Sequence, residues 1–177
     1  MTLARTLALT LALIAAPAAH ATSFTFDTLP ASGALSGAPG DTLGFGYAIA
    51  NPSATDWLVI TSIDAGTFLD GTPDASLFDF PVLAPGASLT ISFVAGASGL
   101  FAFTWDAAAP IGSSNAGLFV LGAEWWSGDP GASGSFLSLA TPASAPYVLS
   151  AVPEARAALL LAAALALAWS RRRTRVR

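Results

Sequence analysis

Short segments in which large apolar residues alternate with small or polar ones make up most of the chain between residues 22 and 150. The clearest segment is 42–50, where every second residue is large and apolar (Leu43, Phe45, Tyr47 and Ile49). A period of two places successive side chains on opposite faces of a β-strand. The same region has no convincing apolar period of 3.6 residues, the signature of an amphipathic helix. The pattern therefore predicts an all-β region.

Turn residues (Gly, Pro, Ser, Asn and Asp) divide this region into short candidate strands. The predicted strands are 23–28, 42–50, 57–63, 77–83, 88–95, 99–105, 117–126, 135–139 and 147–151, and a single helical turn is expected around 106–109. Short strands at intervals of about 8 to 15 residues favour an antiparallel β-sandwich. We predict one such domain over residues 22–150, with about seven to nine strands.

The N-terminal 21 residues have the three parts of a secretory signal peptide. Residues 1–5 carry positive charge, residues 6–16 are apolar, and Ala19 and Ala21 form an Ala-x-Ala cleavage site. We predict cleavage after Ala21. The alternative is an uncleaved N-terminal anchor, but the apolar run is shorter than the roughly 20 residues that a membrane span needs.

The C-terminus combines an apolar run with a basic end. Residues 157–169 are uncharged, and the end that follows holds Arg171, Arg172, Arg173, Arg175 and Arg177. Lipid excludes charge and requires satisfied backbone hydrogen bonds, so we predict one C-terminal transmembrane helix, about 154–170, in contact with membrane lipid. The basic end, 171–177, acts as a cytoplasmic stop-transfer signal. The residues between the two ends are then exported.

A short motif, Val152-Pro153-Glu154, precedes the apolar run, from which Ala155 and Arg156 separate it. The motif, the apolar helix and the arginine cluster together resemble the PEP-CTERM sorting signal of Gram-negative bacteria, although Ala155 replaces the second proline of that family. The resemblance implies processing by an exosortase after signal peptidase, and transit through the inner membrane. It also implies a final place in the cell envelope or extracellular matrix, linked to exopolysaccharide and biofilm. The alternative is a simple C-terminally anchored membrane protein.

Two resemblances concern the segment between the ends. The turns Pro39-Gly40-Asp41 and Leu83-Ala84-Pro85-Gly86, each placed before a strand, resemble those of bacterial immunoglobulin-like adhesion and spacer domains. This likeness implies an immunoglobulin-like sandwich. The order of short motifs along the segment, including Glu124-Trp125-Trp126 and Gly128-Asp129-Pro130, is also similar to a recurrent ectodomain of PEP-CTERM proteins. That second likeness implies no particular activity.

The exported segment has an extreme charge balance. Between residues 22 and 152 there is no Lys, Arg, His or Cys, while ten acidic residues are present: Asp27, Asp41, Asp56, Asp64, Asp70, Asp74, Asp79, Asp106, Glu124 and Asp129. Such a polyanion is not expected to bind nucleic acid, whose affinity comes chiefly from phosphate neutralisation. Catalysis through Ser-His-Asp or Cys-His groups is excluded, as are imidazole and thiolate metal sites. No pattern marks the paired buried acids of a glycosidase. We therefore expect a protein that is not an enzyme and has no cofactor.

Trp125 and Trp126, flanked by Glu124 and Asp129, form the candidate ligand-binding patch. Neighbouring strand residues point to opposite faces, so at least one indole should face outward or lie at a sheet edge. An exposed indole can stack on a sugar ring while carboxylates accept hydroxyl hydrogen bonds, which makes a carbohydrate-binding module with exopolysaccharide as partner the alternative function. The competing interpretation buries one Trp in the core and packs the other at an edge.

Calcium is the one metal for which the acids offer ligands. Asp64, Asp70, Asp74 and Asp79 fall within sixteen residues of each other, around a Gly-containing turn. The Asp-x-Asp-x-Asp-Gly spacing of a dedicated calcium loop is absent. Turn formation, in which Asp side chains accept hydrogen bonds from nearby backbone, is the more ordinary role.

Overall fold

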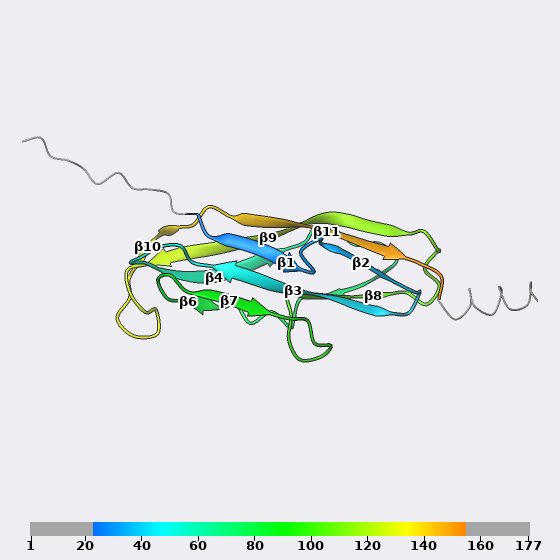
Figure 1. Ribbon diagram of the computed structural model, residues 1–177, viewed down its shortest axis with the longest axis horizontal. Helices are drawn as coiled ribbons and strands as arrows, with labels where there is room; N and C mark the ends of the chain where they lie inside the picture. The colour runs from blue at the N-terminus through cyan, green and yellow to red at the C-terminus, as the bar shows by residue number, and fades with distance from the viewer. Residues whose placement is uncertain (1–22, 155–177) are drawn as a thin grey trace, which may run out of the picture.

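A computed structural model describes residues 23–154 of the chain and contains two β-sheets packed face to face, with no helix among these residues (Figure 1). The strands are β1 (Thr25–Leu29), β2 (Ala34–Gly37), β3 (Thr42–Ala50), β4 (Trp57–Asp64), β5 (Gly71–Asp74), β6 (Val82–Leu83), β7 (Ser88–Ile91), β8 (Phe101–Trp105), β9 (Ser114–Trp126), β10 (Phe136–Leu139) and β11 (Ala143–Ala151). The predicted all-β, sandwich-like architecture is confirmed. The described residues hold eleven strands rather than seven to nine.

The first sheet has the order β1-β3-β8-β5, and β7 also pairs with β3. All its pairs are antiparallel. Two strands pair one after the other along the same edge of β3. β7 pairs with residues 47–50, and β8 pairs with residues 42–45. Residues 92–100 leave the sheet between these two strands. For this reason the predicted strands 88–95 and 99–105 are longer than those observed.

The second sheet has the order β2-β11-β9-β4-β6, and β10 also pairs with β9. Its centre is β9, which pairs with β4 along one edge and with β11 and then β10 along the other. The β2–β11 pair is parallel, so the prediction of a wholly antiparallel sandwich is wrong at this edge. The physical reason is that the chain crosses between the sheets after β1 without reversing its direction, so β2 runs beside β11 (Figure 1).

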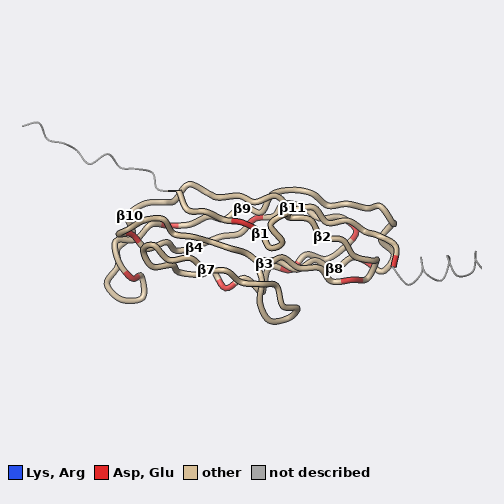
Figure 2. The backbone as a smooth tube through the Cα atoms, viewed as in Figure 1, with Lys and Arg blue, Asp and Glu red and all other residues tan. Residues whose placement is uncertain are grey.

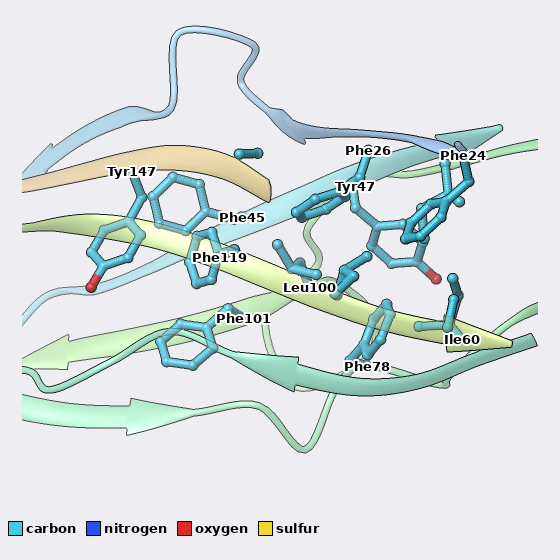
Figure 3. Close-up of a cluster of buried hydrophobic side chains, with 14 of the residues drawn as sticks. Phe24, Phe26, Phe45, Tyr47, Ile60, Phe78, Leu100, Phe101, Phe119 and Tyr147 are labelled. Atoms are coloured by element: carbon cyan, nitrogen blue, oxygen red, sulfur yellow. The ribbon is translucent and has the colours of Figure 1, made fainter. Parts of the chain in front are cut away.

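Aromatic side chains from both sheets meet in the core (Figure 3). Phe45 of β3 contacts Phe119 of β9 edge-to-face, with ring centroids 5.2 Å apart. Phe119 also lies 4.6 Å from Tyr147 of β11. All three side chains are buried, because each occupies the inward position of its alternating strand. The alternation in the sequence thus supplies the inner face of each sheet.

Several local predictions are wrong. Of the predicted strand 77–83, only Val82–Leu83 is a strand. The expected helical turn at 106–109 is a hydrogen-bonded turn in which the Ala109 N–H donates to the Asp106 carbonyl at 2.9 Å. Strands β2 and β5 were not predicted, because their sequences, ALSG and GTPD, lack large alternating residues.

The two ends of the described segment lie at opposite ends of the long axis (Figure 1). The last strand, β11, runs to Ala151, one residue beyond the predicted domain boundary. Within residues 23–154 no helix is long and apolar enough to cross a membrane. The predicted signal peptide, with Ala19 and Ala21, lies outside the described residues. So do the basic end and, apart from Glu154, the predicted transmembrane helix.

Candidate functional site

The two tryptophans of the predicted patch lie on opposite faces of the second sheet. Along β9 the odd-numbered side chains from Phe119 to Trp125 are buried, and the even-numbered ones point outward. Trp125 is 7% exposed and pairs with Leu58 of β4, which is completely buried. Trp125 therefore belongs to the core, while Glu124 and Trp126 are partly exposed on the outer face.

Neighbouring strands extend the outer face around Trp126. The residue opposite Trp126 on β4 is Trp57, and the residue opposite it on β10 is Phe136. Directly opposed residues of antiparallel strands project from the same face, so the three rings form one row across the sheet. The ring centroids of Trp126 and Phe136 are 6.3 Å apart, and the rings are nearly perpendicular at 84°.

A second row lies beside the aromatic one, two residues away along β4 and β9 and three residues away along β10, where the pairing with β9 contains a bulge. It contains Glu124 of β9, with Val59 of β4 and Leu139 of β10 opposite it, and Val82 of β6 opposite Val59. Phe136 is 51% exposed and Leu139 is 74% exposed. We call the two rows together the outer aromatic face; it consists of Trp57, Val59, Val82, Glu124, Trp126, Phe136 and Leu139.

A hydrogen bond orients the central indole of this face. The Trp126 Nε1–H donates to the Glu124 carboxylate at 3.0 Å. The two residues are two positions apart on one strand, so their side chains lie side by side on the same face. A carboxylate has about four acceptor positions, and this bond occupies one. Glu124 thus fixes the indole and keeps further capacity to accept hydrogen bonds.

Asp129, the fourth residue of the predicted patch, lies in the loop between β9 and β10. Its Oδ1 accepts a hydrogen bond from the Gly131 N–H at 2.8 Å, which forms a local turn. The loop is closed at its base by the Ser127 N–H, which donates to the Ser135 carbonyl at 3.0 Å. Asp129 is therefore engaged in shaping its own loop and is not part of the two rows.

The four aspartates considered for calcium are each engaged separately. The N–H groups of Gly66 and Ser76 donate to Asp64 and Asp74, each at 2.8 Å. Hydrogen bonds from Ser76 hold the pKa of Asp74 below its usual value. The hydroxyls of Ser113 and Tyr47 donate to Asp70 at 2.8 Å and to Asp79 at 2.7 Å. Among residues 23–154, no three His, Cys, Asp or Glu side chains are grouped so that they could hold a metal ion.

The two tyrosine hydroxyls serve the fold. Burial, followed by the hydrogen bond to Asp79, raises the pKa of Tyr47 far above its usual value. Burial, with a smaller effect from the charge of Asp64, also raises the pKa of Tyr147, whose hydroxyl donates to the Ala65 carbonyl at 2.7 Å. Both phenols therefore stay protonated at neutral pH and link β3 and β11 to connecting segments.

The predicted sorting motif, Val152 to Glu154, starts where the sandwich ends. Ala151 is buried as the last residue of β11, and the N–H of Val152 donates to the Gly37 carbonyl at 2.9 Å. Val152, Pro153 and Glu154 are all exposed. Ser114, the first residue of β9, pairs with Ser150 and therefore lies at the same end of the sandwich as Val152. Trp126 lies twelve residues further along β9, about 40 Å away at roughly 3.3 Å per residue.

Trp57 and Phe136 were missed as site residues by the sequence analysis. The alternation Trp57-Leu58-Val59 indicates that Trp57 and Val59 share a face, but strand pairing alone brings that face beside Trp126. No protein-family model matches this chain, and a search of curated proteins found no match.

Proposed function

We propose that this chain is an exported, non-enzymatic protein of the cell surface or extracellular matrix, delivered by a signal peptide and sorted through a PEP-CTERM-type tail. The single observation that carries the proposal is that the sandwich is complete at Ala151, directly before the exposed motif Val152-Pro153-Glu154. Cleavage at the motif would remove no buried residue of the described core, which spans Phe24 to Ala151. A sorting enzyme could therefore release or transfer the domain with its fold intact.

The strand order supports an immunoglobulin-like domain as the exported cargo. Such domains pack a sheet of order A-B-E-D against one of order C-F-G. Here the order β1-β3-β8-β5 faces β4-β9-β11, and β1, β3, β4, β8, β9 and β11 follow the chain order of A, B, C, E, F and G. β5, in the position of D, also follows this chain order, because it lies between β4 and β8 in sequence, and the short strand β6 is an addition beside β4. A sandwich of this kind suits a spacer or adhesion module.

The charge distribution limits which polymers the exported domain can contact. All Asp and Glu residues of the chain lie between residues 23 and 154, where no Lys or Arg occurs, and Figure 2 shows them spread over strands and loops of both sheets. Self-repulsion keeps such a domain soluble and disfavours anionic polymers as partners. The polymer linked to its export would then be contacted through uncharged or apolar groups.

Intact-mass measurement of the protein recovered from the producing cells tests the proposal, because one spectrum reports both ends. The expected mature product lacks residues 1–21 and ends near Pro153–Glu154, so that it has lost residues 171–177. A mature product that still carries Arg171 to Arg177 would refute cleavage by a sorting enzyme and favour a simple membrane anchor. A product that retains residues 1–21 would refute the signal peptide.

A paired variant identifies the motif as the cause of cleavage. Pro153→Ala with Glu154→Ala should leave the C-terminal arginines on the recovered protein. The matched control is Asp129→Ala with Pro130→Ala, which alters another acid–proline pair, in the loop before β10, and should be processed normally. Equal processing of both double variants would contradict recognition through Pro153 and Glu154.

A further inference from the structure

The outer aromatic face is apolar where an exposed sheet face is ordinarily polar. Three aromatic side chains, Trp57, Trp126 and Phe136, come from three adjacent strands, and only one charged residue, Glu124, lies among them. Strands are about 4.8 Å apart, so the aromatic row is about 10 Å long. We propose that this face binds a neutral glycan chain, whose sugar rings stack on Trp126 and Trp57 and whose hydroxyls donate to the Glu124 carboxylate.

The hydrogen bond from Trp126 to Glu124 prepares the face for such a ligand. It holds the indole in one orientation before binding, so less side-chain freedom is lost when a ring stacks on it. The same bond leaves acceptor positions on the carboxylate beside the indole. An aromatic surface with an adjacent acceptor matches a pyranose, which has an apolar face and hydroxyls around its rim.

Charge excludes the main alternative polymers. The described residues carry no Lys or Arg, so every charged side chain that a uronate chain or a nucleic acid would meet there is negative. A second copy of the chain is also disfavoured. In a two-fold dimer formed by the same face, like patches meet, so the Glu124 carboxylates of both copies would be enclosed in one apolar contact that offers no Lys or Arg from the described residues to pair with them. A neutral glycan introduces neither repulsion.

The face is placed where a polymer can reach it. Trp126 ends β9 at the end of the sandwich opposite Ala151 and the sorting motif (Figure 1). A domain held or transferred through its C-terminus would therefore present the aromatic row about 40 Å from the point of attachment, at roughly 3.3 Å per residue along β9.

The test is titration of the full chain, purified in detergent, with defined oligosaccharides while tryptophan fluorescence and heat are measured. The neutral probes are cellohexaose, maltohexaose, chitohexaose and mannohexaose, with polygalacturonate as the anionic probe and choline as the cationic one. We expect at least one neutral probe to bind with an affinity that changes little between low and high salt, and polygalacturonate to show no binding.

Variants tie the binding to the face. Trp126→Ala should weaken binding at least about tenfold, equivalent to 1.4 kcal/mol, and Trp126→Phe should restore part of the loss because a stacking ring remains. Glu124→Gln should weaken binding less than Trp126→Ala. The matched control is Leu118→Ala, which removes a side chain that is 52% exposed on the outer face of the same strand, about 26 Å from Trp126 at roughly 3.3 Å per residue. This control should bind as the parent does.

Three results would overturn the proposal. The first is no response to any neutral probe by the folded parent protein. The second is binding to choline or polygalacturonate alone. The third is equal loss in Trp126→Ala and Leu118→Ala while the unfolding temperatures of both match the parent. The binding measurement concerns the outer face only, whereas the mass measurement concerns the two ends, so the glycan site and the sorting tail can each fail separately.

Discussion

A hydrogen bond between Tyr47 and Asp79 fixes the connection between β5 and β6 onto the core. Removing the Tyr47 hydroxyl and removing the Asp79 carboxylate should lower the free energy of unfolding by different amounts. The Tyr47 hydroxyl donates to Asp79 at 2.7 Å, and the Tyr47 ring packs edge-to-face on Phe78 with centroids 5.1 Å apart. Tyr47 is buried, whereas Asp79 is exposed. When the bond is lost, the Asp79 carboxylate can therefore form a hydrogen bond with water, whereas the buried Tyr47 hydroxyl cannot.

The magnitudes follow from this asymmetry. A hydrogen bond to a charged group contributes about 1.5–3 kcal/mol, and the exposure of Asp79 favours the lower end, so Tyr47→Phe should cost about 1.5 kcal/mol. Asp79→Ala should cost more, about 2–3 kcal/mol, because it leaves a buried hydroxyl without its acceptor. The double variant should lose less than the sum of the single losses, because both remove the same bond. At about 3–5 °C per kcal/mol, Tyr47→Phe should lower Tm by about 6 °C.

Thermal and urea unfolding of the full chain, followed by near-ultraviolet circular dichroism, measures all members of this cycle. Tyr147→Phe is the matched control, because its hydroxyl donates to the Ala65 carbonyl and shares no partner with Asp79. Its effect should be the same with or without Asp79→Ala. Additive losses for Tyr47→Phe and Asp79→Ala, or a Tyr47→Phe loss below about 0.5 kcal/mol, would refute the reasoning.

The same tyrosine predicts a loss of stability in alkali. Its pKa in the folded protein is raised, by burial first and then by Asp79, above the value of about 10 that it has when unfolded. The folded state therefore keeps a proton that the unfolded state releases, and the free energy of unfolding falls as pH rises above about 10. The phenolate absorbance of Tyr47, taken as the difference between the parent and Tyr47→Phe, should appear only on unfolding, and Tyr47→Phe should flatten the decline. Unchanged alkaline sensitivity in that variant would contradict the assignment.

Two further predictions concern other buried contacts. Asn51→Ala should cost at least about 2 kcal/mol in urea unfolding, because the carbonyls of Asp56, Leu83 and Ala84 would lose the buried amide as a donor, and only for Ala84 does the Ala87 N–H offer a second loop donor; a loss under about 0.5 kcal/mol would contradict this role. Gly44→Ala should cost about 1–3 kcal/mol, because a methyl group there overlaps the ring of Phe93. Phe93→Ala in the same chain should remove most of the Gly44→Ala effect, and an undiminished effect would show that the ring is not the cause.

The sequence predicted the long strands well where alternation is strong. The predicted strand 42–50 matches β3, and its large residues Phe45, Tyr47 and Ile49 are all buried. It overpredicted a strand at 77–83, where apolar content is high but Phe80 has a positive φ of 49° and Phe78 fills the core from a connection. Apolar content reports burial, whereas strand formation also requires a partner at the right distance and direction.

The candidate site shows the same difference between what the local pattern predicts and what strand pairing decides. Local alternation required Trp125 and Trp126 to face opposite ways, but the sequence left open which of them points inward. Pairing with β4 places Trp125 beside Leu58 in the core and Trp126 beside Trp57 outside. Phe136 joins them only because β10 folds back onto the end of β9. The predicted Asp129 is set apart by its own turn.

By itself, the sequence determined the period-two strands, the uniform negative charge, the exclusion of chemistry that needs Cys, His, Lys or Arg between residues 22 and 152, and the tripartite pattern of the tail. These properties are local or compositional, so they need no knowledge of distant contacts. The tertiary structure alone decided the parallel edge between β2 and β11 and the joining of Trp57, Trp126 and Phe136. Each depends on residues that are remote in the chain and become neighbours only when backbone hydrogen bonds and core packing select one register.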